Sequence, residues 1–446
     1  MKLNVKDKHI GILGAGLAGS LLAKMLRQVG FDVSVFEKRS DPRTAKNTEG
    51  RSINLALSHR GIRALEAAGA YDDIADQLIP MKGRLMHGID GNMTIQPYGK
   101  QGQFINSVSR SELNKALISG AESAGTKFYF EQRCTGTDLS KTEIRLEENG
   151  SIKKRSLDGL IGADGAFSVM RKALLARDRF NYQQQYIGHG YKELSMPPIN
   201  DDFAMEPNYL HIWPRGQFML IALPNPDKTF TCTLFLAFEG EVAFEHLKTH
   251  RDVEDFFASY FPDAADLIPD LTGQFEQNPT SSLVTVRCDP WYYQDAMIIG
   301  DAAHAIVPFY GQGMNAAFED VRLFTEMGVE MGFKWRELLA SFYRSRKKDA
   351  DAIASLALHN FIEMRDAVAD ERFLQRKAVD AMMHEEFGER WIPMYTMVTF
   401  SDIPYSEALN RGTLQEDLLI NAQKNEYLDD LDRIMADLKA FEDHDV

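Results

Sequence analysis

Three glycines near the N-terminus have the spacing of a phosphate-binding turn. Gly14, Gly16 and Gly19 follow a short apolar run and precede a stretch with helical periodicity. Glycines at this spacing permit a tight turn that brings the free N–H groups of a helix N-terminus close to a pyrophosphate. Glu37, at the end of the next apolar run, can accept hydrogen bonds from a ribose. The pattern predicts a dinucleotide-binding site.

Two later segments place an aspartate after a buried strand. Asp164 lies in Gly-Ala-Asp-Gly, which taken alone is most often a turn. Asp301 follows an apolar run and precedes the glycine-rich residues 311–315, which open a helix over 314–328. The N-terminus of that helix can stabilise negative charge on a bound ring.

The elements that must position these residues follow from periodicity. A strand at 9–13, a helix at 17–29 and a strand at 31–36 make a βαβ start. Alternation around an Asn-Gly pair predicts a β-hairpin over 142–157. The remaining expected elements are a helix at 58–69, strands at 186–194, 209–213, 217–223, 230–238 and 297–300, helical stretches at 242–268 and 335–384, and an acidic surface helix beyond 410.

A chain of 446 residues exceeds the roughly 250–300 at which one core stops growing, so we expect more than one unit. The elements predict an α/β fold with a Rossmann-like nucleotide-binding domain, an antiparallel-sheet substrate domain and a helical C-terminal region. The proposed division is 1–80, 100–180 and 282–345 for the first, 81–99 and 181–281 for the second, and 346–446 for the third.

Composition argues against several classes of partner. The net charge is -15, with 50 Lys and Arg against 65 Asp and Glu, so nucleic acid and anionic membranes are poor partners.

The three cysteines lie far apart, and His9, His87 and residues 384–386 show no metal-ligand spacing, so no disulfide framework or metal site is expected. The N-terminus lacks a signal-peptide pattern and no segment approaches about 20 apolar residues, which predicts a cytoplasmic protein without a membrane anchor.

In their order along the chain, the three glycine-containing motifs resemble the FAD-binding domain of single-component flavoprotein aromatic hydroxylases, the para-hydroxybenzoate-hydroxylase-like fold. The stretches 50–58, 83–84, 96–99, 189–194, 210–214 and 395–400 extend the resemblance to the kynurenine-hydroxylating branch of that family. The resemblance implies tightly bound FAD, NADPH as a transient co-substrate, and dioxygen. The residues that it assigns to the cofactor are Gly14, Gly16, Leu17, Ala18, Gly19, Glu37, Lys38, Arg39, Arg110, Asp164, Asp301, Pro308, Gly311, Gln312, Gly313, Met314 and Asn315.

The resemblance also implies the reaction, hydroxylation of L-kynurenine to 3-hydroxy-L-kynurenine in tryptophan degradation, through a flavin hydroperoxide and without a catalytic side chain. Kynurenine needs a cation and hydrogen-bond donors at its amino-acid end and an apolar slot for its ring. Arg84, Tyr98 and Asn360 match the carboxylate-binding positions of the family, with Tyr395 nearby. The ring slot is assigned to Leu210, Ile221, Phe235, Pro308, Phe309 and Met364, with Glu363 as a polar neighbour.

Two positions receive separate expectations. Tyr310 stands where the family often has His or Phe, so its role beside the substrate is open, and His304 is expected to be structural. Three alternatives remain: a related flavin hydroxylase for another aromatic acid, a flavin-dependent halogenase, whose Trp-x-Trp-x-Ile-Pro signature is missing, and a non-catalytic protein that keeps the FAD fold as a binding scaffold. A small aromatic amino acid is the expected partner, and the chain is expected to be a monomer or homodimer.

Overall fold

The computed structural model describes residues 5, 8–44, 54–99, 102–148, 150–363 and 371–444. Its first unit begins as predicted with β1 (His9–Leu13), α1 (Leu17–Val29) and β2 (Asp32–Phe36). Gly30 ends α1 in the left-handed region with φ 114, where its N–H bonds back to the last turn of the helix. Both strands are parallel neighbours in register from His9↔Asp32 to Leu13↔Phe36. The predicted βαβ start is confirmed.

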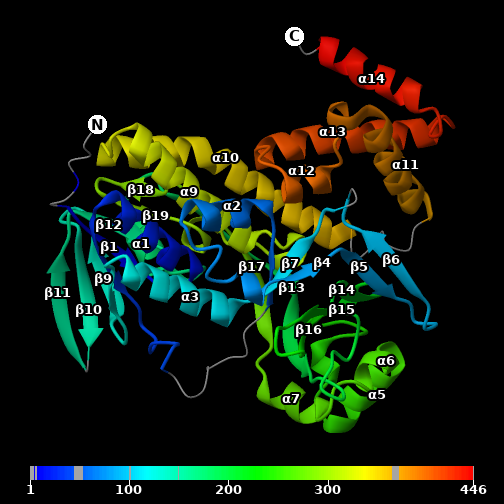
Figure 1. The fold of residues 1–446 in the computed structure, drawn as a ribbon, viewed down its shortest axis with the longest axis horizontal. Helices are drawn as coiled ribbons and strands as arrows, with labels where there is room; N and C mark the ends of the chain where they lie inside the picture. Colours follow the sequence, from blue (N-terminus) through cyan, green and yellow to red (C-terminus); the bar gives the residue numbers. More distant parts are fainter. Residues whose placement is uncertain are drawn as a thin grey trace.

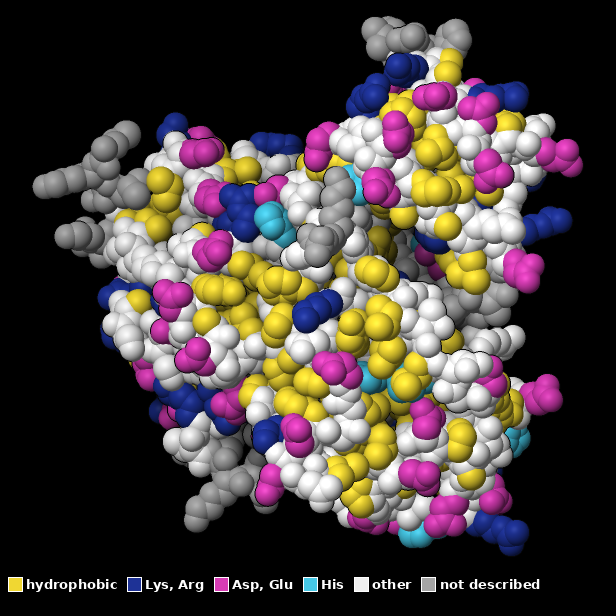
Figure 2. Space-filling view, turned by 45° about the vertical axis from the view of Figure 1, so that its right-hand side comes forward, with side chains coloured by type: hydrophobic (Ala, Val, Ile, Leu, Met, Phe, Trp, Pro, Cys, Tyr) yellow, Lys and Arg dark blue, Asp and Glu magenta, His cyan; other side chains and the backbone are white. Residues whose placement is uncertain are grey.

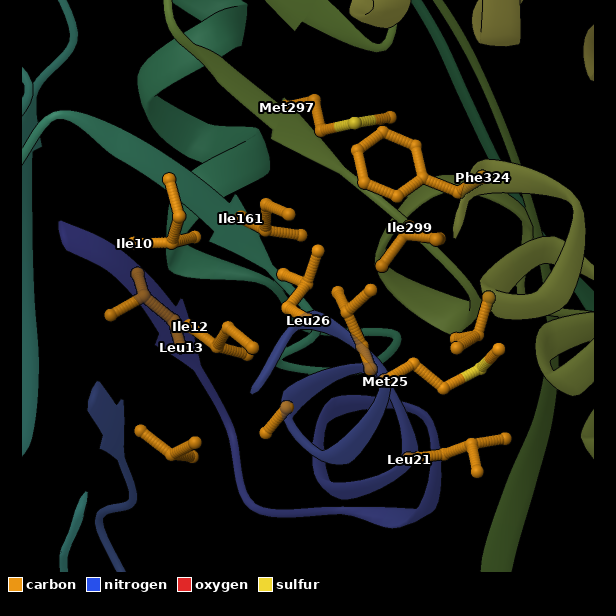
Figure 3. Close-up of a cluster of buried hydrophobic side chains, with 14 of the residues drawn as sticks. Ile10, Ile12, Leu13, Leu21, Met25, Leu26, Ile161, Met297, Ile299 and Phe324 are labelled. Atoms are coloured by element: carbon orange, nitrogen blue, oxygen red, sulfur yellow. The ribbon is translucent and has the colours of Figure 1, made fainter. Parts of the chain in front are cut away.

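A six-stranded sheet forms the centre of this unit, in the order β18-β19-β12-β1-β2-β8. Its neighbours are parallel except for the edge pair β18–β19. Side chains of β1 and β12 and of α1 form the core between sheet and helix, as Figure 3 shows for Ile10, Ile161 and Leu26, all fully buried. The added strands are β8 (Lys127–Tyr129), β12 (Gly159–Gly162), β18 (Tyr292–Tyr293) and β19 (Ala296–Ile298).

The second sheet has seven strands in the order β17-β13-β16-β15-β14-β5-β6. All neighbours are antiparallel except β14 and β5. The strands predicted in this region are confirmed, the first being longer than expected. Their bounds are β5 (Gly83–His87), β6 (Met93–Pro97), β13 (Asn181–Met196), β14 (Leu210–Arg215), β15 (Phe218–Pro224), β16 (Phe230–Ala237) and β17 (Ser281–Asp289).

Strand β17 crosses the proposed domain boundary. The sequence division assigned residues from 282 onward to the first unit, but β17 pairs with β13 from Tyr191↔Ser281 to Asn181↔Asp289. These backbone hydrogen bonds extend the large sheet to Asp289, and the chain returns to the six-stranded sheet at β18. The rest of the division stays a prediction.

Two three-stranded sheets flank the first unit. One contains the predicted hairpin, whose turn residue Asn149 lies outside the described residues; its strands are β9 (Arg133–Asp138), β10 (Glu143–Glu148) and β11 (Ser151–Ser156). The other joins β3 (Asn54–Leu57), β4 (Ile79–Met81) and β7 (Ile105–Ser109). The nearby helices are α2 (His59–Ala67), α3 (Arg110–Ser123) and α4 (Val169–Leu175), with the short turn η1 (Ala75–Gln77).

The stretch expected to be helical over 242–268 is divided into several short helices. Phe261 leaves helical geometry and Pro262, which lacks an N–H donor, starts the next helix. The stretch therefore folds as η2 (Phe244–His246), α5 (His250–Tyr260) and α6 (Pro262–Ala265), followed by α7 (Leu271–Gln277).

The rest of the described chain is helical, and Figure 1 shows α11 to α14 gathered at one end of the molecule. The stretch expected over 335–384 is described as two helices, with residues 364–370 outside the described part. None of the described helices combines the length and apolar character needed to cross a bilayer. The elements are α8 (Asp301–His304), η3 (Pro308–Tyr310), α9 (Gly313–Glu330), α10 (Trp335–Ile362), α11 (Glu371–Phe387), η5 (Gly388–Arg390), α12 (Met394–Phe400), α13 (Tyr405–Lys424) and α14 (Leu431–His444).

Candidate active site

The glycine turn between β1 and α1 packs tightly against the protein on one side and faces open space on the other. Gly14 has φ +99, and an added Cβ would lie 2.6 Å from the Ala163 carbonyl oxygen. A Cβ at Gly19 would collide with the Gly14 carbonyl oxygen, whereas one at Gly16 would meet nothing within 4 Å. Glycine is therefore required at two positions by close packing, and Gly16 borders open space, as a turn that cradles a phosphate requires.

Glu37 is held beside this turn at the end of β2. Its buried carboxylate accepts hydrogen bonds from the backbone N–H of Ala15 (3.0 Å) and of Arg39 (3.0 Å), and from the Arg39 guanidinium (2.9 Å). Burial alone would raise the pKa of Glu37, but these donors lower it below the ordinary value. The carboxylate is ionised and fixed, so it can accept a ribose hydroxyl. Leu17 and Ala18 are half-buried in the first turn of α1, and the Lys38 and Arg39 side chains are exposed.

Two aspartates lie near the same open space. Asp164 accepts the N–H groups of Val169 (2.6 Å) and Met170 (3.2 Å) through one oxygen, while its buried Oδ1 has no partner among the described residues. Asp301 has an accessible side chain, yet the surrounding protein raises its pKa by desolvation, which the exposed Arg110 partly offsets. The orphaned oxygen and the open turn fit a bound dinucleotide such as FAD.

The glycine-rich turn before α9 is built by its own side chains. Asn315 accepts the Ser58 N–H (2.9 Å) and donates to the carbonyls of Ala56 (2.8 Å) and Gly311 (2.9 Å). Gln312 donates to the Ser58 hydroxyl (3.3 Å) and accepts from the Tyr405 hydroxyl. Both side-chain amides therefore bond to the protein and hold the turn in place. The other residues that the sequence assigns to this turn are Pro308, which is exposed, and Gly313 and Met314, which are half-buried.

Arg84 lies among tyrosines where β5 meets α12. Its guanidinium carbon is 4.8 Å from the ring centroid of Tyr395 and 5.5 Å from that of Tyr98, and these two rings stack 5.8 Å apart. Tyr310 stacks on the other side of Tyr395 at 5.6 Å. The groups acting on the Arg84 charge are tyrosines, and no carboxylate of the described residues pairs with it. The buried Tyr98 hydroxyl has no hydrogen-bond partner among the described residues, and burial raises its pKa well above the ordinary value, so it stays protonated.

Four of the predicted ring-slot residues, Phe235, Phe309, Ile221 and Leu210, lie in hydrophobic clusters of the same region. Phe309 packs against Phe235 (5.0 Å between centroids) and Phe361 (4.5 Å). Ile221 and Tyr395 each pack against two hydrophobic clusters, one around Phe309 and one that contains Tyr98 and Leu210. The apolar end is therefore continuous with the polar end. Figure 2 shows hydrophobic side chains gathered across the middle of one face of the molecule.

Three further predicted residues lie at the end of α10 or beyond it. Asn360, matched to the carboxylate-binding set, donates from Nδ2 to the Phe309 carbonyl (2.6 Å), which ties α10 to η3. Glu363 forms an ion pair with Lys377 (3.4 Å). Met364 lies outside the described residues.

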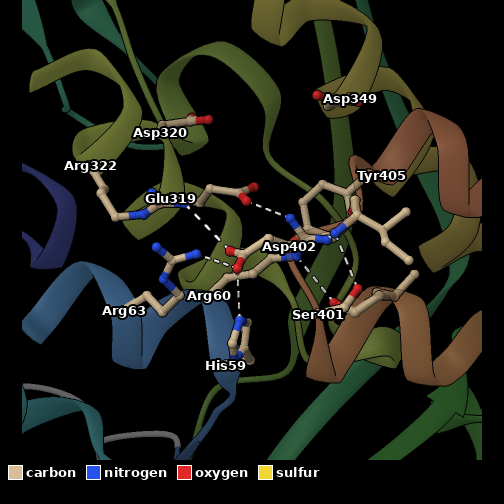
Figure 4. A network of polar contacts seen from close by, with 12 residues as sticks. His59, Arg60, Arg63, Glu319, Asp320, Arg322, Asp349, Ser401, Asp402 and Tyr405 are labelled. Atoms are coloured by element: carbon tan, nitrogen blue, oxygen red, sulfur yellow. Dashed lines mark hydrogen bonds and ion pairs between the residues drawn. The ribbon is translucent and has the colours of Figure 1, made fainter. Parts of the chain in front are cut away.

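A buried ionic network lies next to the site, and the sequence analysis did not predict it. Arg346 bonds to Glu319 (2.9 Å) and Asp320 (3.0 Å), and Glu319 also pairs with Arg60 of α2 (Figure 4). His304, expected to be structural, bonds to Asp320. Burial alone would lower the pKa of His304, but Asp320 raises it. Charged residues at helical spacing carry no sequence signal for burial, because a solvated helix face has the same pattern.

Comparisons with known proteins agree with this geometry. Residues 7–355 match the family described as FAD binding domain. The chain is 46% identical over 429 residues to kynurenine 3-monooxygenase of Flavobacterium johnsoniae, covering 95% of each chain, and 44% identical over 424 residues to that of Sus scrofa, covering 94% of this chain and 89% of the relative.

The solved structure of 2-methyl-3-hydroxypyridine-5-carboxylic acid oxygenase superposes with a TM-score of 0.68 at 19% identity, covering 84% of this chain and 97% of that one. The predicted fold class, an FAD-binding α/β domain with an added sheet and a helical C-terminal region, is confirmed. The chain belongs to the kynurenine 3-monooxygenase family of FAD-binding hydroxylases.

Proposed function

We propose that this protein is a flavoprotein monooxygenase that hydroxylates L-kynurenine to 3-hydroxy-L-kynurenine, using bound FAD, NADPH and dioxygen. The observation that carries the proposal is the position of Arg84, a half-buried guanidinium surrounded by tyrosines and without a carboxylate partner among the described residues. A partly desolvated guanidinium forms strong, charge-assisted hydrogen bonds with a carboxylate. A substrate carboxylate would supply the missing charge.

The polar groups around Arg84 fit an amino acid. Kynurenine has a carboxylate, an ammonium, a ketone and an aniline ring. Arg84 can take the carboxylate through charge-assisted hydrogen bonds, and the unpartnered Tyr98 hydroxyl can donate a second one. The hydroxyls of Tyr310 and Tyr395 supply further polar contacts beside it.

The apolar end then positions the ring. Phe235, Phe309 and Ile221 offer aromatic and aliphatic surface continuous with the Arg84 cluster, which orients the substrate along one axis and keeps water from the ring. FAD, when bound, supplies the reduction of dioxygen and the transfer of one oxygen atom to the ring, with NADPH as the electron donor. Gly14, Gly16, Gly19 and Glu37 would hold its dinucleotide part, and Asp164, Asp301 and Arg110 border the same space.

The side chains of this site have a supporting role in the chemistry. The aniline nitrogen already enriches the ring carbon at position 3 in electrons, so no protein nucleophile is needed. The backbone of the turn at Gly311, braced by Asn315 and Gln312, can present the N-terminus of α9 to negative charge that develops on the flavin ring. The site-residue roles are proposals that rest on this placement.

The test is NADPH oxidation by the purified yellow protein with and without L-kynurenine, with the product mass measured in the same tube. Acceleration together with a gain of one oxygen atom supports the proposal. Acceleration without an oxygenated product would make kynurenine an uncoupling effector. No acceleration would favour another aromatic acid, and a colourless protein that binds no added FAD would favour a non-catalytic scaffold. The oligomeric state and the cytoplasmic location stay predictions.

A further inference from the structure

Three metal-ligating side chains converge where α10 and α13 pack together, and they share only Glu363 with the candidate active site. They are His359 and Glu363 at the end of α10 and Glu416 in α13, and their ligand atoms all lie within 4.8 Å of one another. His359 is exposed and the two carboxylates are half-buried. We propose that this cluster binds a divalent transition-metal ion of the zinc type.

The helical backbone explains why the first two ligands point to one place. His359 and Glu363 are four residues apart, which puts both side chains on one face of α10. Asp349 of α10 accepts the backbone N–H of Ser406 (3.0 Å), so α13 is held against that helix. Glu416 thus approaches the pair from a second helix, and the three ligands come from two rigid elements.

The ligand chemistry selects the class of metal. One imidazole with two carboxylates suits zinc and its neighbours, whereas magnesium and calcium prefer sites made of oxygen alone. Ligand atoms around a tetrahedral zinc ion lie about 3.3 Å apart, which rotation of accessible side chains can reach from the observed spacing. Three protein ligands leave a fourth position for water.

In the structure, a lysine neutralises part of the negative charge of this cluster. Lys377 of α11 lies 3.4 Å from one Glu363 oxygen, with 48% of its side chain exposed. A divalent cation can therefore compete with Lys377 for a cluster that has more acids than bases.

The experiment is isothermal titration of the FAD-loaded, chelator-treated enzyme with zinc chloride, together with its melting temperature. We expect one saturable site per chain and a rise in melting temperature, with binding at least tenfold weaker in both His359→Ala and Glu416→Gln. Lys377→Met should bind zinc more tightly, because the competing cation is gone. Magnesium chloride in excess should not displace zinc.

The matched control is His250→Ala, which removes another exposed histidine beside a carboxylate, 3.2 Å from Glu276, and should leave the zinc affinity unchanged. Absence of saturable binding, or equal affinity in the wild type, His359→Ala and Glu416→Gln, overturns the proposal. Both substitutions are at accessible side chains and the second is isosteric, so a folding defect in one variant leaves the other to decide.

Discussion

At the scale of single residues, the unpaired charge of Arg84 gives the sharpest prediction. Arg84→Ala removes a charge-assisted contact worth about 1.5–3 kcal/mol, so the KM for kynurenine should rise by about 10- to 150-fold. Steady-state kinetics measure it. The matched control is Arg177→Ala, since Arg177 stacks on Tyr293 at 4.3 Å beside the six-stranded sheet and should leave the KM unchanged. An unchanged KM in Arg84→Ala would remove Arg84 from the substrate site.

The Tyr98 hydroxyl allows a test in which binding and stability change in opposite directions. Tyr98→Phe deletes a buried hydroxyl that has no partner in the ligand-free structure, so the melting temperature without substrate should stay equal or rise. The KM should rise about 2- to 10-fold because a donor to the substrate is lost. Tyr293→Phe serves as the control for the substitution itself. A lower melting temperature with an unchanged KM would show that the hydroxyl is only structural.

At the scale of elements, a hydrogen-bonded chain of side chains joins β5, β14 and α6. His211 bonds to His87 (2.9 Å) and to the Glu206 carbonyl (2.8 Å), and His87 contacts Asp263 (3.1 Å) and stacks on Trp213 at 4.0 Å. Burial lowers the pKa of His211 to about 4 from 6.5. Inside the sheet domain this imidazole is therefore neutral.

The sign of the resulting pH dependence follows from proton uptake. Between pH 6.5 and 4 the unfolded chain binds a proton at His211 that the folded chain does not, so stability present above pH 6.5 falls as the pH drops. The loss reaches about 3 kcal/mol. His211→Gln should reduce the difference in melting temperature between pH 7 and pH 5, whereas His246→Gln, at an exposed position, should leave it unchanged. Identical profiles for His211→Gln and the wild type would contradict the assignment.

At the scale of the whole molecule, the buried ionic network connects the nucleotide-binding unit to the C-terminal helices. Arg346 is 4% exposed and bonds to Glu319 and Asp320 of α9, while Asp349, one turn further along α10, bonds to Ser406 of α13. Tyr405 packs on the Arg60 guanidinium at 4.0 Å and reaches Gln312 of the flavin-side turn. The helices that carry Tyr395 and Glu416 are thereby held against the cofactor domain.

Breaking this network should lower the free energy of unfolding far more than breaking a surface ion pair. Arg346→Met removes the cation that bridges Glu319 and Asp320, leaving Glu319 with Arg60 and Asp320 with His304 as their remaining partners, and should destabilise the fold by about 3–5 kcal/mol. Arg336→Met removes a pair with Asp295 at 2.6 Å whose arginine is 66% exposed, and should cost less than about 1 kcal/mol. Chemical denaturation of both variants measures the difference. Equal small losses would mean that the network contributes little to stability.

Local patterns were sufficient to predict much of the fold and part of the site. The βαβ start, the hairpin around residue 149 and the strands of the large sheet depend on turn residues and alternation within short segments, and the structure has them where the sequence predicts them. The glycine turn was also predictable, because close packing at Gly14 and Gly19 admits no side chain. The break at Phe261 within the helical stretch expected over 242–268 was not predicted, because helical periodicity continues on both sides of it.

By itself the sequence determined the glycine turn, the strand and helix periods and the acidic character of the chain, since these depend on neighbouring residues. Only the tertiary structure decided that Arg84 lies beside the stacked rings of Tyr98 and Tyr395, with no carboxylate of the described residues paired to it. It also decided that Arg346 is buried and that the ligand atoms of His359 and Glu416 lie within 4.8 Å of each other. Spacing along the chain carries no information on which helix faces which. Burial of a charge is set by that packing, and burial makes these charges significant for binding and stability.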